Sequence, residues 1–73
     1  MKYILELTNA EDPRQESSWC APLESALPIP IAAVGDEVEV SGRESLTLIV
    51  VKRLFLYLTD RQEHYVQLFC RRK

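Results

Sequence analysis

The chain has few of the residues on which catalytic and metal sites depend. Its 73 residues include one histidine, two cysteines and two glycines. Cys20 and Cys70 fit no metal spacing, because a zinc site needs clustered ligands. His64 is the only histidine that could serve a nucleophile as a base, and two glycines do not make a phosphate-cradling loop. We therefore predict that the protein is not an enzyme, with no catalytic residues, no metal site and no cofactor.

The sequence also lacks an apolar run long enough to cross a membrane. The longest candidate, Leu46–Leu58, has thirteen residues and carries Lys52 and Arg53 near its centre. A spanning helix needs about 20 apolar residues, and central charges are costly in a bilayer. The apolar-rich run near the N-terminus is shorter than a secretory h-region. We expect a cytoplasmic protein with no membrane partner and reduced thiols; a Cys20–Cys70 disulfide remains the alternative.

The composition is that of one small globular domain covering residues 1–73. Apolar residues make up 47% of the chain and charged residues 27%, which is not a disordered composition. A chain this short buries only about 60% of its unfolded surface, so partners or oligomerisation often add stability. The net charge of −2 is uneven: residues 1–44 hold three bases and nine acids, and residues 45–73 hold six bases and two acids. Such asymmetry can mark two faces with different partners, or the halves can neutralise each other on folding.

Residue types in Leu46–Leu58 favour a strand over a helix. Four of its residues are β-branched and two are aromatic, and these types prefer the pleated surface. Its even positions are all aliphatic except Lys52, and a buried lysine in a long straight strand is rare. We therefore expect a bulge, bend or strand end within Val51–Arg53, with at least one of the two charges in solvent.

The segment after this strand alternates, which predicts a hairpin with a five-residue loop over Asp60–His64. This loop pairs Leu58 with Val66, Leu56 with Leu68 and Leu54 with Cys70, and it groups the aliphatic residues on one face. The predicted core is Leu54, Leu56, Leu58, Val66, Leu68 and Val40. The opposite face, which we call the aromatic–arginine face, comprises Arg53, Phe55, Tyr57, Tyr65, Phe69 and Arg71.

Two shorter strands are predicted elsewhere. Residues 2–8 alternate, and Val38 and Val40 point inward after a Gly35-Asp36 turn. Residues 9–33 are a long irregular excursion in which Asp12 and Pro13 could begin a short helical turn. These elements predict a mostly all-β fold, a small antiparallel barrel or sandwich. The turn, the Val-x-Val strand, the bent strand and the hairpin resemble the small SH3-like barrels over about residues 31–70, which implies topology only.

The leading functional hypothesis is a non-catalytic protein-interaction domain: an adaptor, an inhibitor or a small homo-oligomer. Aromatic and arginine side chains are enriched at protein interfaces, so the aromatic–arginine face is the expected contact, with an exposed strand edge as the other option. The sequence leaves open whether Trp19 and the proline-containing segment cover that face.

Two other functions remain as alternatives. The basic residues and aromatics of the second half could bind nucleic acid, although such domains usually present a net basic footprint. Alternatively, the acids of the first half could dock on a basic, nucleic-acid-binding partner, as small acidic inhibitors do.

Overall fold

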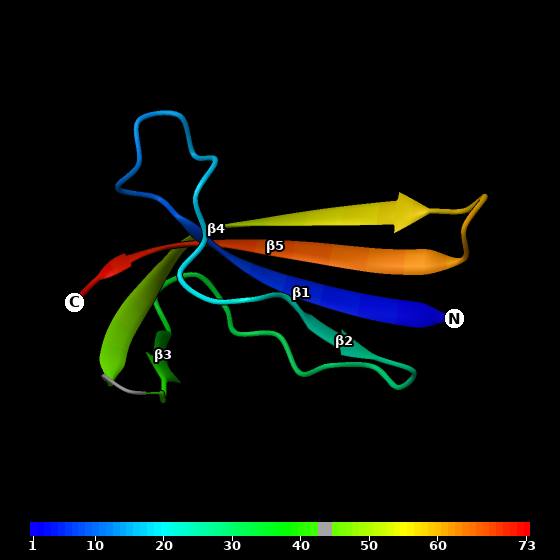
Figure 1. Cartoon of the computed structure of the whole chain (residues 1–73), viewed down its shortest axis with the longest axis horizontal. Helices are drawn as coiled ribbons and strands as arrows, with labels where there is room; N and C mark the ends of the chain where they lie inside the picture. The colour runs from blue at the N-terminus through cyan, green and yellow to red at the C-terminus, as the bar shows by residue number, and fades with distance from the viewer. Residues whose placement is uncertain (43–44) are drawn as a thin grey trace.

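A computed structural model describes residues 1–42 and 45–73, and within these residues the fold is all-β with five strands and no helix. The strands are β1 (Lys2–Asn9), β2 (Leu23–Ser25), β3 (Glu37–Val40), β4 (Leu46–Leu58) and β5 (Glu63–Arg72). They form one sheet in the order β2-β1-β5-β4-β3 (Figure 1). None of the described segments is a helix that could span a membrane.

The sheet is mixed, which corrects the expected antiparallel arrangement. β1 and β5 run parallel, and the other three neighbouring pairs are antiparallel. The first and last strands can be parallel neighbours because the rest of the chain supplies the long crossover that a parallel pair requires. Local patterns in β1 and β5 carry no information about this pairing.

The sheet curls into a half-barrel because β4 bends near its middle (Figure 1). The strand extends over Leu46–Leu58 as predicted. Val50 pairs with Cys70 and Lys52 pairs with Phe69, so Val51 is the extra residue of a β-bulge. Lys52 and Arg53 are both exposed, which confirms the predicted break. A bulge increases local twist, and the first half of β4, with β3 paired to it, therefore runs at an angle to the second half.

The predicted hairpin forms, but its register is wrong by three positions. The turn occupies residues 59–62, and Leu58 pairs with Glu63 instead of Val66. A register shift by an odd number of residues brings each side chain of β4 onto the same face as the other set of β5 side chains. Phe55 therefore shares a face with Val66, while Leu54 and Leu56 lie on the other face. The observed pairs are Arg53–Leu68, Leu54–Gln67, Phe55–Val66 and Leu56–Tyr65.

The core lies on the concave face and comes mainly from β1, β5 and the first half of β4. Its buried members are Leu5, Leu7, Leu48, Val50, Val66, Leu68 and Cys70. Val66 and Leu68 are therefore confirmed as core residues. Leu54 and Leu56 are exposed, and Leu58 and Val40 are only half-buried. The prediction failed for β4 because the bulge ends its contribution to the core at Val50.

The excursion after β1 contains turns instead of the predicted helical turn. The Asp12 carboxylate accepts hydrogen bonds from the backbone N–H groups of Arg14, Glu16 and Ser17, at 3.0–3.1 Å. These bonds close a loop with Gln15 at φ 53°, and short polar side chains commonly compete with helix formation in this way. Farther along, Ile29, Ile31 and Ala32 of the proline-containing segment pack against the core.

Candidate functional site

The structure divides the aromatic–arginine face between the two sides of the sheet. Cross-strand partners share a face, and Arg53, Phe55 and Tyr57 are paired with Leu68, Val66 and His64, on the concave side. Tyr65, Phe69 and Arg71 lie on the convex side, where their partners are Leu56, Lys52 and Ile49. The predicted single face is therefore wrong as a geometric unit, because its six residues form two separate groups.

The concave half lies at the hairpin end of the sheet. The Arg53 guanidinium lies 5.5 Å from the Phe55 ring centroid. The His64 ring meets Tyr57 and Tyr3 edge to face, at centroid distances of 4.9 and 5.1 Å. These contacts are of the cation–π and T-shaped kinds, which fix ring orientation. Even so, 41% of Phe55 and 64% of Tyr57 remain exposed.

The convex half is less accessible. Phe69 is buried at 6% exposure, with the Lys52 ammonium 5.1 Å from its ring centroid. Tyr65 is half-buried, and Arg71 donates to the carbonyl of the adjacent Arg72 at 3.0 Å. Phe69 therefore contributes little to any exposed surface.

The outer edge of β4 is free along residues 52–58, a segment that we call distal β4. β3 pairs only with Leu46–Ile49, and on the side away from β5 no described strand lies beside the rest of β4. The Cys70 carbonyl accepts a hydrogen bond from the N–H of Ala10, which directly follows β1, so the backbone groups of Cys70 face β1. The backbone groups of the adjacent Phe69 therefore face β4. Alternation then directs the N–H and C=O groups of Arg53, Phe55 and Tyr57 away from β5, to the open edge.

Distal β4 is apolar as well as unpaired. Every residue from Val51 to Tyr57 is exposed. On the concave side the edge carries Phe55 and Tyr57, and on the convex side it carries Leu54 and Leu56, which are 38% and 40% exposed. An exposed apolar edge of this length is a template for pairing with another strand.

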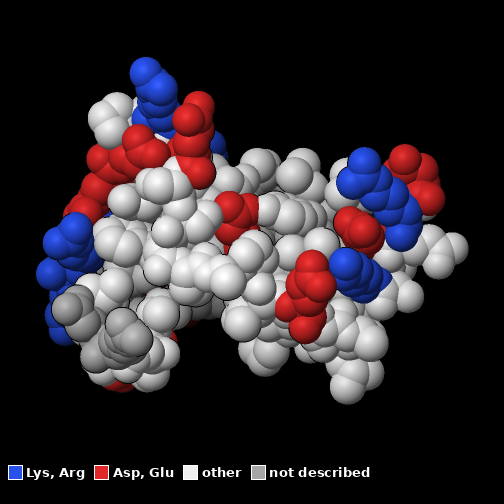
Figure 2. Space-filling view, viewed as in Figure 1, with Lys and Arg blue, Asp and Glu red and all other residues white. Residues whose placement is uncertain are grey.

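Charged residues gather at both ends of the molecule, with the two signs mixed (Figure 2). Lys2 lies 3.4 Å from Glu24, Arg72 lies 3.5 Å from Glu11, and Lys73 pairs with Glu37. The last two of these pairs join the two halves of the sequence, whose charges thus partly neutralise each other. On the face shown, most of the middle is uncharged.

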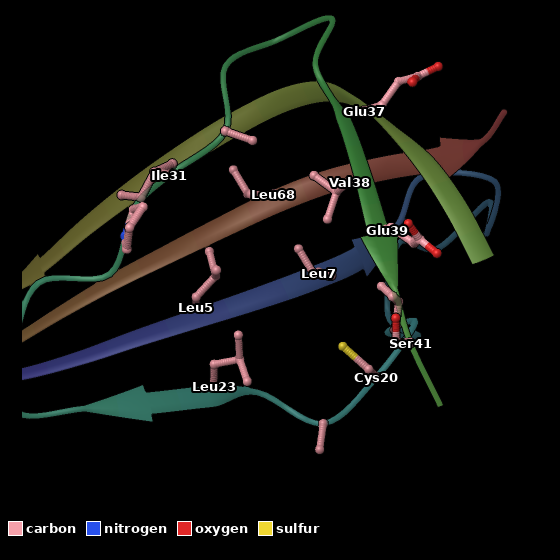
Figure 3. Close-up of a pocket in the computed structure, with 14 residues that line it drawn as sticks. Leu5, Leu7, Cys20, Leu23, Ile31, Glu37, Val38, Glu39, Ser41 and Leu68 are labelled. Atoms are coloured by element: carbon pink, nitrogen blue, oxygen red, sulfur yellow. The ribbon is translucent and has the colours of Figure 1, made fainter. Parts of the chain in front are cut away.

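A groove of about 700 Å³ occupies the open side of the half-barrel, between β2 and β3 (Figure 3). Its floor is formed by Leu5, Leu7 and Leu68, and its walls include Leu23 of β2 and Val38 of β3. The volume falls within the range of ligand-binding clefts, which are about 300–1,000 Å³. Among the residues that the structure describes, Glu37 and Glu39 are the charged ones that line it.

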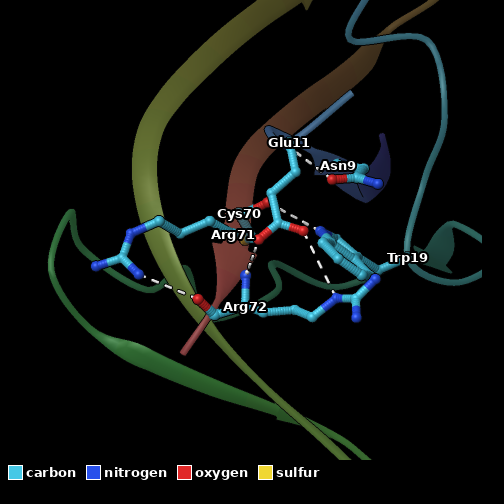
Figure 4. Close-up of polar contacts among 6 residues, drawn as sticks. All are labelled: Asn9, Glu11, Trp19, Cys70, Arg71 and Arg72. Atoms are coloured by element: carbon cyan, nitrogen blue, oxygen red, sulfur yellow. Dashed lines mark hydrogen bonds and ion pairs between the residues drawn. The ribbon is translucent and has the colours of Figure 1, made fainter. Parts of the chain in front are cut away.

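Trp19 packs beside Cys70 and Arg72 (Figure 4), which are at the end of β5 away from the hairpin turn. Its indole N–H donates to the Cys70 carbonyl at 2.9 Å, and the Arg72 guanidinium lies 5.4 Å from its ring centroid. The Glu11 carboxylate accepts a hydrogen bond from the Arg72 backbone N–H at 3.3 Å and forms an ion pair with the Arg72 guanidinium. Trp19 therefore does not cover Phe55 or Tyr57.

The potential metal-ligating and nucleophilic side chains are scattered over the described part of the chain. No group of three potential metal-ligating side chains comes together among them. Cys20 and Cys70 are free thiols, and burial, followed by the nearby Cys20, raises the pKa of Cys70. A raised pKa disfavours the thiolate that a nucleophilic cysteine requires.

The chain matches no family model, no curated protein and no solved structure in the comparisons made.

Sequence reasoning named a strand edge as a possible contact but did not locate it, and it missed the groove. One signal was available for the edge. A strand predicted around Val38 and Val40 is too short to pair along all of Leu46–Leu58. It therefore leaves part of the longer strand without a neighbour on that side. No comparable signal existed for the groove, because β2 is only three residues long and its position depends on tertiary contacts.

Proposed function

We propose that the protein is a non-catalytic interaction domain that assembles with a second copy of itself through the edge of distal β4. The observation that carries the proposal is the run of seven exposed residues, Val51 to Tyr57, on a strand whose edge opposite β5 has no described neighbour there. Natural edges are usually protected by charges, proline or a covering segment. Here the charges are confined to Lys52 and Arg53, next to the bulge.

A twofold axis at Phe55 gives the longest uninterrupted ladder between two copies. The straight part of β4 runs from the bulge to Leu58, and Phe55 is its midpoint. Antiparallel pairing about this point sets Phe55 opposite Phe55 of the second copy and Arg53 opposite Tyr57 of the second copy. These are the residues whose backbone groups point outward, so each pair can form two hydrogen bonds.

Side chains are compatible with this register. Leu54 falls opposite Leu56 of the second copy, and Lys52 falls opposite Leu58, so no like charges meet across the new ladder. Asp60 follows Leu58 by two residues, which brings a carboxylate close to Lys52 of the other copy. A register centred on Arg53 would instead oppose two arginines. Charge therefore favours the axis at Phe55.

Sedimentation of the wild-type protein tests the proposal directly. The expected species has twice the 8.4 kDa chain mass. In Phe55→Pro the lost N–H is one that points away from β5, so the proline removes no bond within the chain but blocks the edge. This variant should sediment at the chain mass and keep its β-sheet circular dichroism. Phe55→Ala, which keeps the N–H, should associate more weakly than wild type but remain dimeric at high concentration.

Proline on the other free edge is the matched control. Glu39→Pro on β3 should leave the dimer intact, because β3 does not take part. A wild-type protein that sediments at 8.4 kDa at every concentration, or a dimer lost in Glu39→Pro but kept in Phe55→Pro, contradicts the proposal.

The other sequence-based hypotheses remain predictions. These are the nucleic-acid-binding and acidic-inhibitor functions, the cytoplasmic location, and the SH3-like identity of residues 31–70. Self-association is preferred to nucleic-acid binding because Arg72 and Lys73 of the basic tail are already engaged by Glu11 and Glu37.

A further inference from the structure

The groove lies where the half-barrel remains open. β2 and β3 are the two ends of the sheet order, and residues of both line the same cavity. In Figure 3 the side chains of Leu5, Leu7 and Leu68 point into this space from β1 and β5. Figure 2 shows the corresponding hollow between the end of the molecule that carries β3 and its middle. An apolar concavity beside an unpaired strand edge has the form of a peptide-binding cleft.

The outer edge of β3 presents backbone groups to this groove. Val50 donates to the Asp36 carbonyl at 3.1 Å and accepts from Gly35 at 2.8 Å, so its backbone groups face β3. Leu48, two residues earlier, faces the same way and pairs with Val38. The N–H and C=O groups of Glu39 therefore point away from β4. No described residue forms a hydrogen bond with them.

The side chains around this edge specify what an added strand would need. Val38 and Val40 turn inward and pack against the core, and the carboxylates of Glu37 and Glu39 lie on the outer side of β3 (Figure 3). A strand beside β3 would place alternate side chains over the apolar floor and the others next to these carboxylates. Glu37 already pairs with Lys73, whereas Glu39 has no ion pair with any described residue.

We propose that the groove between β2 and β3 binds an extended segment of a protein partner that adds as a strand to the free edge of β3. The segment alternates apolar residues, which fill the groove, with lysine or arginine residues, which meet Glu39 and Glu37. Main-chain hydrogen bonds supply affinity in this mode, and alternate side chains supply specificity. The site is separate from the β4 edge, where Lys52 and Arg53 would repel a basic segment.

A short capped peptide of alternating valine and lysine is the probe, titrated by calorimetry and mapped by amide chemical shifts. It should bind the full chain and shift the amides of β3 and of Leu5 and Leu7. A peptide of the same composition with its lysines and valines in two blocks should bind at least about tenfold more weakly, because it cannot alternate across a strand. A peptide of alternating valine and glutamate should bind more weakly than the lysine peptide.

Two variants at one position separate the backbone from the charge. Glu39→Lys should weaken the lysine peptide about five- to tenfold and favour the glutamate peptide, because an attractive pair becomes repulsive. Glu39→Pro removes the outward N–H and should abolish binding of both. Phe55→Pro should bind the probe as wild type does. Equal affinity for the alternating and blocked peptides, shifts confined to β4, or no binding of the alternating peptide overturns the inference without affecting the β4 dimer.

Discussion

Val50 and Lys52 are two residues apart in one strand, yet their side chains lie on opposite faces of the sheet. Val50 pairs with Cys70 in the core, whereas Lys52 pairs with Phe69 on the convex side. Residues at i and i+2 of a regular strand share a face. The extra residue of the bulge, Val51, reverses this alternation between Val50 and Lys52. The same step moves Leu54 and Leu56 out of the core and leaves distal β4 with apolar side chains on both faces.

The first prediction concerns which leucines hold the fold together. Leu68 is 1% exposed and Leu48 fully buried, whereas 40% of Leu56 is accessible. Leu68→Ala and Leu48→Ala should each cost about 2–5 kcal/mol of unfolding free energy, because a buried leucine leaves a cavity. Leu56→Ala should cost less than about 1 kcal/mol in the monomeric Phe55→Pro background. Urea denaturation measures all three, and an equal loss in Leu56→Ala would contradict the observed register.

The second prediction concerns the indole of Trp19. Its N–H bonds to the Cys70 carbonyl, which also accepts from Ala10. Trp19→Phe removes one donor but leaves the carbonyl satisfied, so the expected loss is about 1 kcal/mol. Trp19→Ala also removes the packing surface and should cost about 3–5 kcal/mol. Because Trp19 is the only tryptophan, circular dichroism and not fluorescence should follow the unfolding. Equal stability of all three proteins would show that the indole contributes nothing.

A third prediction follows from Asp12. Hydrogen bonds from the backbone of Arg14 and from Ser17 lower the pKa of this carboxyl from its ordinary value of 3.8. A carboxyl whose pKa falls on folding stabilises the fold above its unfolded pKa, and this contribution is lost as pH falls through the folded value. Asp12→Asn should therefore lower the urea midpoint at neutral pH, and the difference from wild type should shrink below about pH 4. A difference that stays constant down to pH values well below about 3 would contradict the assigned bonds.

Reactivity of the two thiols provides a fourth prediction. Burial raises the pKa of Cys70, and its side chain is fully buried, whereas Cys20 is half-buried and borders the groove. Because the thiolate is the reactive form, a maleimide at neutral pH should modify Cys20 rapidly and Cys70 only on unfolding. Mass spectrometry of the native protein, with Cys20→Ala as control, should show one modification in wild type and none in the variant. Rapid double modification would show that Cys70 is accessible.

Sequence reasoning found four of the five strands and the hairpin that joins the last two, but it missed β2, the register of the hairpin and the pairing of β1 with β5. The strand Leu46–Leu58, a break within Val51–Arg53 and the inward direction of Val38 and Val40 all follow from residue type and alternation. The aromatic–arginine face failed because its six members were assigned through a hairpin register chosen to group the aliphatic residues. That choice assumed that the leucines after the bulge belong to the core. The parallel contact with β1 and the packing of Trp19 fill the core without them.

What the sequence by itself determined is therefore local: the alternation of four of the five strands, and an irregularity where Lys52 and Arg53 interrupt an aliphatic strand. Tertiary structure decided the rest. The pairing of β1 with β5 joins segments from opposite ends of the chain, and the ends of the sheet define both the open groove and the free edge of β4. Strand alternation fixes which side chains share a face, but the free energy of burying those faces depends on neighbours that no local pattern specifies.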